Sequence, residues 1–186
     1  MSEIKINLPI NSFKRWDDLR FPSQGINPPG AASDPVRSTT TGLLEFSGST
    51  DNVICGIAQM PHSWARGSTI YPHLHLRFLT SSATNSRWKL EYHIADNITP
   101  FTNSYGIYTD GGTITIANPQ NVNKEVLQGF NPIVMAGLKE SAVVVWKITR
   151  LANSDAADNY TGIVVLLEFD IHFQADKMGT VSEIPD

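Results

Sequence analysis

Cysteine is almost absent from this sequence of 186 residues, because Cys55 is the only one. A single thiol excludes an internal disulfide framework. Cys55 lies in the apolar run NVICGIAQM, which predicts a buried and chemically inert thiol. Such sparing use of cysteine is typical of a protein made in a reducing cytoplasm.

Charge of either sign is also scarce. The chain has 14 Lys and Arg against 18 Asp and Glu, a net charge of −4, and its charged fraction is 17%, against about 25% in an average protein. No run of basic residues is present, so the sequence predicts no direct binding to nucleic acid. Because 41% of the residues are hydrophobic, we expect part of the surface to be covered by assembly.

Long hydrophobic runs are missing as well. The longest, GIVVLL, is far shorter than the roughly 20 residues of a membrane span. The opening residues MSEIKINLPINS lack the basic start and long apolar stretch of a signal peptide. The sequence therefore predicts a soluble protein without a membrane partner.

Residues 1–40 are rich in proline, serine, glycine and threonine, and FPSQGINPPGAASDP is unsuited to a helix and poor as a strand. Within this region Phe13, Trp16 and Leu19 recur every three residues, which predicts one short helix. Aromatic side chains are not expected in a disordered leader. We therefore interpret residues 1–40 as an extended arm that docks through Phe13, Trp16 and Phe21, and we expect the remainder to fold without it.

Residues 41–186 have a β pattern of short segments rich in β-branched and aromatic residues, separated by Gly, Asn, Asp and Pro. NKEVLQG is the exception and predicts a brief helix, while Asp110-Gly111-Gly112 predicts a turn. This spacing predicts an all-β fold, an antiparallel β-sandwich of jelly-roll type. The expected strands are TGLLEF, DNVICGIAQM, IYPHLHLRFLT, SRWKLEYHIAD, GIYTDGGTITIA, SAVVVWKITRLA and TGIVVLLEFDIHFQ.

Two of these segments have one apolar and one ionisable face. Residues two apart on a strand point to the same side, so His73 and His75 share a face, as do Glu168, Asp170 and His172. A polar face of an antiparallel sheet ordinarily faces water. If these two faces meet, the imidazoles and carboxylates form a hydrogen-bonded structural cluster. We expect acid below the usual imidazole pKa of ~6.5 to weaken it.

A metal site is the alternative interpretation of this pair. Gly67, five intervening residues and His73-x-His75 are similar to the first motif of the cupins, which are metal-dependent enzymes. The glutamate expected next in that motif would fall at Leu79 or Thr80, which are not metal ligands. We therefore predict no catalytic residues and no cofactor. A structural metal held by His73, His75 and His172 remains an alternative.

A third interpretation is a carbohydrate-binding β-sandwich. It requires exposed aromatic residues, for which the candidates are Trp64, Trp88 and Trp146. Scattered acids such as Asp17 and Asp18 are expected to be solvated.

Three stretches together resemble a family of small structural proteins of tailed-bacteriophage virions. They are AQMPHSWARGSTIYPHLHLRF, WKLEYHIAD and ITRLANSDAADNYTGIVVLLEFDIHFQADKMGTVSE, with RWDDLRFP upstream. Where many relatives have tryptophan after His-x-His, this chain has Leu76-Arg77. The shared features are Pro61-His62, Gly67, Pro72-His73, His75, Asp170-Ile171-His172, Asp176 and Gly179-Thr180.

The resemblance implies a virion protein that is synthesised in the cytoplasm of the bacterial host and acts by assembly. A head decoration or stabilising protein is the first expectation, ahead of a collar, fibre-base or tail-adaptor protein. Its partners would be other virion proteins and its own copies in a homo-oligomer, expected to be a trimer. The residues expected to pair within or between subunits are His62, His73, His75, Glu168, Asp170 and His172.

Overall fold

The computed structural model describes residues 14–96, 108–122 and 124–179 of the chain. Within these ranges the only helical segment is the three-residue turn η1, so none is long enough to cross a membrane. The strands are β1 (Arg15–Pro22), β2 (Val36–Arg37), β3 (Leu44–Phe46), β4 (Asn52–Gln59), β5 (Tyr71–Phe78), β6 (Asn85–Ala95), β7 (Thr109–Ala117), β8 (Val126–Gly129), β9 (Val143–Arg150) and β10 (Val164–Ala175), with η1 at Ser23–Gly25.

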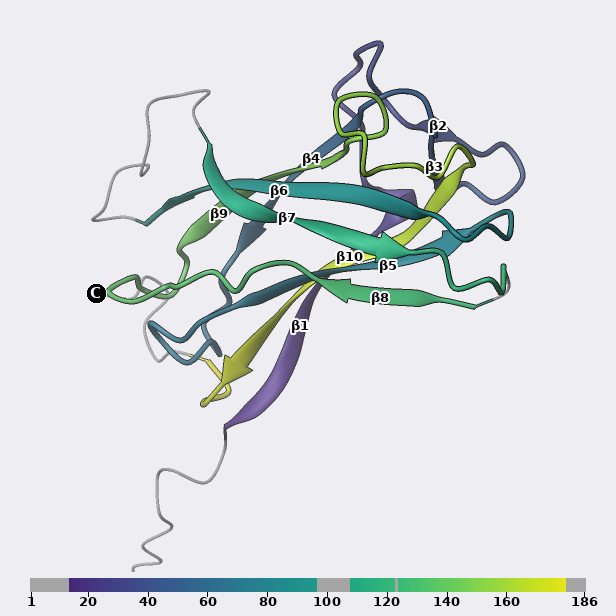
Figure 1. Cartoon of the computed structure of the whole chain (residues 1–186). Helices are drawn as coiled ribbons and strands as arrows, with labels where there is room; N and C mark the ends of the chain where they lie inside the picture. Colours follow the sequence, from purple (N-terminus) through teal and green to yellow (C-terminus); the bar gives the residue numbers. More distant parts are fainter. Residues whose placement is uncertain (1–13, 97–107, 123, 180–186) are drawn as a thin grey trace, which may run out of the picture.

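Two antiparallel sheets pack face to face as a β-sandwich of jelly-roll type (Figure 1). One sheet has the order β2-β3-β10-β5-β8, with β1 also paired to β10, and the other has the order β4-β9-β6-β7. Each of the seven segments expected from its β pattern contains all of one of these strands, or all but one terminal residue of it. The predicted all-β sandwich is confirmed.

The core lies between the sheets because each strand turns alternate residues inward. On β9, for example, Val144, Trp146 and Ile148 are buried while their neighbours are half-buried. On β10, Phe169 meets Trp146 of the opposite sheet with ring centroids 4.8 Å apart. The core therefore fixes which face of β10 points outward.

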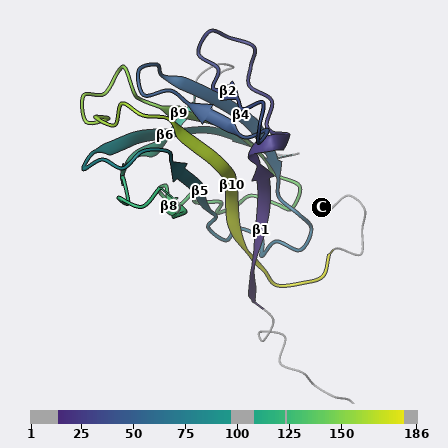
Figure 2. The ribbon, with the colours of Figure 1, turned by 90° about the vertical axis from the view of Figure 1, so that its right-hand side faces the viewer.

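The helix expected around Trp16 and Leu19 is wrong, because Arg15–Pro22 forms strand β1. This strand pairs with β10 over its whole length, from Arg15 opposite Ala175 to Pro22 opposite Glu168. Figure 2 shows β1 running beside β10, with β5 on the other side. Within the expected arm, Arg15–Pro22 thus lies on its own domain. The period-three pattern was misleading because tertiary pairing outweighs a weak local preference.

Two further local predictions are wrong. The residues NKEVLQG contribute strand β8, which pairs with β5 from Leu76 to His73. Asp110-Gly111-Gly112 lies inside β7 as an irregularity, opposite a shift of register in β6 between Lys89 and Glu91. Gly112 has a φ of +96°, which a residue with a side chain rarely adopts. Glycine therefore marks a bulge here rather than a hairpin turn.

Candidate functional site

The candidate site lies on the outer face of the six-stranded sheet, where three neighbouring strands contribute ionisable side chains. The order is β1, β10, β5. The register places Asp170 opposite His73 and Glu168 opposite His75, while β1 places Asp18 opposite His172. Because directly opposed residues point to the same side of a sheet, the two ionisable faces expected from the sequence form one surface.

The centre of this surface is a carboxylate held between two imidazoles. Nε2 of His73 lies 2.6 Å from Oδ1 of Asp170, and Nε2 of His75 lies 3.2 Å from Oδ2 of the same residue. His73 and Asp170 are 6% and 5% exposed although they lie on an outer face. Their neighbours therefore cover them, and attraction between them is screened little by solvent.

Further charged groups surround this centre. Nε2 of His172 lies 2.9 Å from Oδ1 of Asp18, and the His172 ring meets the His73 ring edge to face at 4.1 Å. On the other side, Nδ1 of His75 contacts the Glu125 carboxylate. We call the set His73, His75, Asp170, His172, Asp18 and Glu125 the histidine–carboxylate cluster.

Two members of the histidine–carboxylate cluster were missed by sequence reasoning. Asp18 was expected to be solvated; its side chain is 41% exposed, but its Oδ1 also lies 2.9 Å from Nε2 of His172. The alternation Trp16, Asp18, Arg20 at every second residue was the available signal, since it is a strand pattern. Glu125 carried no comparable signal, because only the pairing of β8 with β5 brings it to His75.

Glu168 also lies on this face but has a different partner. The Arg20 guanidinium donates two hydrogen bonds to its carboxylate, at 2.7 and 2.6 Å. The Glu168 carboxylate raises the pKa of Arg20 by accepting these bonds and through its charge. Glu168 therefore belongs to an ion pair at the edge of the histidine–carboxylate cluster.

The pKa of His73 is raised above its usual value. Burial is the largest influence and lowers the pKa, but the short contact with Asp170 and the charge of that carboxylate outweigh it, with smaller contributions from the Tyr71 carbonyl and Asp18. A raised pKa means that the folded state holds the proton more tightly than the unfolded state. Protonated His73 therefore stabilises the fold, opposite to the expectation that acid weakens this cluster.

We expect His73 to contribute most stability below about pH 6.5 and to lose that contribution as the pH rises through its raised pKa. His73→Gln is the variant to compare, because it keeps a polar side chain but does not titrate. Thermal unfolding of both proteins in a chelating buffer measures the effect. The gap in melting temperature should be wider at low pH. If the difference in melting temperature between the wild type and His73→Gln is constant, or widens with rising pH, the pKa of His73 is not raised.

The remaining predicted site residues lie elsewhere. His62 is outside the histidine–carboxylate cluster, and its Nε2 lies 2.9 Å from the Ser141 hydroxyl. Phe13 falls outside the described residues. Trp16 is 57% exposed, whereas Phe21 packs on the core with its ring centroid 5.3 Å from that of Trp146. Of the two described docking residues, Phe21 therefore points into the core and Trp16 points to solvent.

The tryptophans proposed for carbohydrate binding are not available for it. Trp64, Trp88 and Trp146 are 0%, 0% and 1% exposed and belong to the core. Sequence alone does not distinguish an exposed tryptophan from a core one when the flanking pattern is apolar.

Cys55 is half-buried rather than fully buried. Burial is the main cause that raises the pKa of its thiol. A raised pKa lowers the fraction of thiolate, so the expectation of an unreactive thiol still stands on physical grounds.

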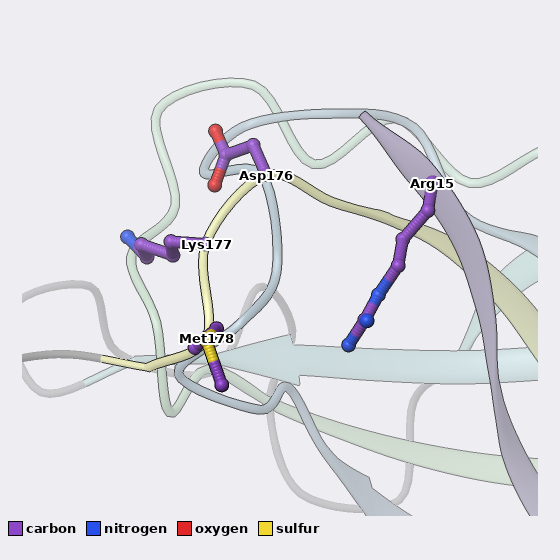
Figure 3. Close-up of a pocket in the computed structure, with 4 residues that line it drawn as sticks. All are labelled: Arg15, Asp176, Lys177 and Met178. Carbon is purple, nitrogen blue, oxygen red and sulfur yellow. The ribbon is translucent and has the colours of Figure 1, made fainter. Parts of the chain in front are cut away.

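A surface hollow lies at the end of β10, lined by Arg15, Asp176, Lys177 and Met178 (Figure 3). Arg15 reaches into it from β1, while Lys177 points away from Arg15 and pairs with Glu140. Met178 is fully exposed. Because Lys177 is engaged outside the hollow, the histidine–carboxylate cluster is the stronger candidate for a functional site.

No protein-family model matches the chain, and no curated protein matches it in sequence. Several solved structures are similar to it in architecture at low sequence identity. A family 35 carbohydrate-binding module from an environmental isolate is 13% identical, with a TM-score of 0.47, covering 90% of this chain and 99% of that one.

Two further examples are more distant. A family 16 carbohydrate-binding module is 10% identical with a TM-score of 0.40, covering 79% of this chain and 89% of that one. The receptor-binding domain of spike protein P1 from bacteriophage PM2 is 11% identical with a TM-score of 0.33, covering 70% and 81%. At these values the likeness extends to the β-sandwich architecture alone.

Proposed function

We propose that this protein is a structural component of a tailed-bacteriophage virion that acts by assembly through the outer face of β1, β10 and β5. One observation carries the proposal. RWDDLRFP is β1, Pro72-His73 and His75 lie on β5, and Asp170-Ile171-His172 lies on β10. These strands are adjacent in the sheet (Figure 2). Motifs that carry the virion resemblance, far apart in sequence, thus gather on neighbouring strands.

The loop that holds the first motif lies close to the same strands. Trp64 forms a bridge with Ala175 at the end of β10, and the Ala65 amide donates a hydrogen bond of 2.6 Å to the Gln174 carbonyl. The Asp176 amide donates to the Ser63 carbonyl at 3.2 Å. The stretch between Pro61 and Gly67 is therefore tied to the end of β10.

The surface chemistry of this face suits a protein contact. Trp16, Tyr71 and Leu127 are 57%, 40% and 57% exposed. Trp16 and Tyr71 pack edge to face at 5.5 Å, and Leu127 lies opposite His75. Exposed aromatic residues are enriched at the centres of protein interfaces, and here they lie beside charges that already pair with one another. We infer that copies of the chain meet here in a homo-oligomer, with a trimer as the expected state.

Trp16→Asp combined with Tyr71→Asp is expected to convert the oligomer to monomers, because charge replaces apolar contact at the interface. Light scattering at micromolar concentration measures the mass of each protein, and circular dichroism checks that the fold is retained. The control is Ile57→Asp, which places one negative charge on the outer face of the other sheet, where Ile57 is 63% exposed. A wild type that is a 20.5 kDa monomer contradicts the assembly proposal.

Position in the particle is a separate part of the proposal. We favour a head decoration or stabilising protein over a collar, fibre-base or tail-adaptor protein. A cryo-EM map of the native particle tests this directly, since ordered copies of the sandwich would occupy the head surface. Copies confined to the collar or tail would overturn the favoured position, and their absence would overturn the virion role.

Carbohydrate binding is the second candidate, and the exposed Trp16–Tyr71 pair is the observation that favours it. Aromatic faces stack on the apolar faces of sugar rings, and polar groups lie beside this pair. Glycan-array binding of the wild type and of Trp16→Ala distinguishes the two functions. Specific binding that Trp16→Ala abolishes without changing the oligomer mass would favour carbohydrate recognition.

A further inference from the structure

Three ligand-bearing side chains of the histidine–carboxylate cluster converge on one point. We propose that Nε2 of His73, Nε2 of His75 and the Asp170 carboxylate bind a divalent transition-metal ion such as Zn²⁺. One ligand atom from each residue lies within 4.8 Å of the others. Tetrahedral zinc with bonds of about 2.0–2.1 Å separates its ligand atoms by about 3.3 Å. The three atoms therefore need only small side-chain adjustments to take up that geometry.

The outer ring nitrogens of both histidines face acceptors. Nδ1 of His75 contacts the Glu125 carboxylate, and Nδ1 of His73 lies 3.4 Å from the Tyr71 carbonyl oxygen. Metal-bound histidines in proteins characteristically donate their second ring N–H to a carboxylate or a backbone carbonyl. This arrangement favours the tautomer with the proton on Nδ1, which leaves the lone pair of Nε2 directed at Asp170.

Asp170 itself needs a cation. The residue is 5% exposed, and its Oδ1 accepts no hydrogen bond of acceptable geometry, although Nε2 of His73 lies 2.6 Å away. Arg20, the nearby arginine, donates instead to Glu168. A buried carboxylate between two imidazole nitrogens is electrostatically unfavourable unless a proton or a metal ion supplies positive charge among them. A proton on His73 satisfies part of this requirement, and a metal ion satisfies all of it.

The ligand set selects the class of ion. Two imidazoles and one carboxylate suit zinc and its neighbours in the first transition row, whereas calcium and magnesium prefer sites made of oxygen. Three protein ligands leave a fourth position, and His75 is the ligand nearest to solvent, with 23% of its side chain exposed. A bound ion would join β5 to β10 across the sheet. The proposal goes beyond the assembly function and does not depend on it.

A second group, Asp18, Asp170 and His172, also lies within ligand distance and shares Asp170. Its other two members, Asp18 and His172, are more exposed, and they already contact each other at 2.9 Å. The two groups are separable by mutation, because Asp18 belongs only to the second and His75 only to the first. The first group is the one proposed.

The test titrates full-length, tag-free protein with zinc chloride after treatment with a chelator, by calorimetry and equilibrium dialysis. We expect one Zn²⁺ per chain and a higher melting temperature in its presence. His75→Gln and Asp170→Asn, both of similar shape to the native side chains, should each weaken binding at least about tenfold. His62→Gln is the matched control and should bind as the wild type does, since His62 lies outside the cluster.

The visible absorption spectrum of bound Co²⁺ distinguishes this site from nonspecific binding at the protein surface. Tetrahedral Co²⁺ with nitrogen ligands absorbs visible light strongly. The variant His75→Gln should lose this absorption band while its circular dichroism spectrum stays that of the native fold. Binding weaker than millimolar, or binding that survives both ligand variants, overturns the proposal. Loss of binding in Asp18→Asn with retention in His75→Gln would place the ion in the second group and also overturns it.

Discussion

Replacing Arg150 by alanine is expected to lower the free energy of unfolding by about 3–5 kcal/mol. Arg150 is completely buried at the end of β9. It forms a bidentate ion pair with Asp158, in which Nε and Nη2 donate hydrogen bonds of 3.1 and 3.0 Å to the two carboxylate oxygens. Its guanidinium also donates to three backbone carbonyls, those of Phe46, Gly162 and Tyr160. All its donors are thus satisfied, and alanine would leave Asp158 charged and buried without its partner.

Urea unfolding followed by circular dichroism measures this loss. Arg150→Lys keeps the charge but lacks the planar guanidinium group that forms the bidentate hydrogen bonds. Its stability should therefore fall between those of the wild type and Arg150→Ala. The control is Arg20→Ala, which removes an arginine of similar geometry whose side chain is 66% exposed, and its effect should be far smaller. Equal effects at Arg150 and Arg20 would mean that burial does not determine the strength of these pairs.

Removing residues 1–22 is expected to abolish cooperative folding of the sandwich. β1 supplies eight residues paired with β10, and Phe21 stacks on Phe169 with ring centroids 5.7 Å apart. Phe21 is partly buried, so its loss alone should cost about 1.5–3 kcal/mol. The uncovered edge of β10 would also be free to pair with other chains. This expectation replaces the sequence-based one, in which deletion of residues 1–40 leaves the β domain folded.

The matched truncation removes residues 1–13 only and keeps β1. We expect its melting temperature to equal that of the full chain, whereas the longer truncation should aggregate or unfold without a clear transition. Thermal unfolding and light scattering of the two proteins make the comparison. A stable, monodisperse protein lacking residues 1–22 would show that β1 is an accessory strand.

The sequence by itself determined seven strands, β3, β4, β5, β6, β7, β9 and β10, and the faces of the two that carry the histidines. Alternation in YPHLHLRF and VVLLEFDIHFQ placed His73 with His75, and Glu168 with Asp170 and His172, because a strand turns every second side chain to the same side. Turn residues between apolar segments likewise predicted an antiparallel sandwich. These properties are local, since they follow from the period of two and from the residues that interrupt it.

Only the tertiary structure decided which strands are neighbours. The adjacency of β5 and β10, with His73 opposite Asp170, depends on pairing between segments nearly a hundred residues apart. Pairing of β1 with the other edge of β10 made RWDDLRFP a strand, because that edge and the core beneath Phe21 outweigh the weak helical pattern of the isolated segment.

The tertiary structure also decided which tryptophan side chains are buried. Trp64, Trp88 and Trp146 are in the core because the two sheets close over them, whereas Trp16 stays outside because β1 turns its alternate side to solvent. Sequence patterns fix the side of a strand on which a residue lies. Whether that side is covered, and by which charged neighbours, depends on long-range packing that no local pattern encodes.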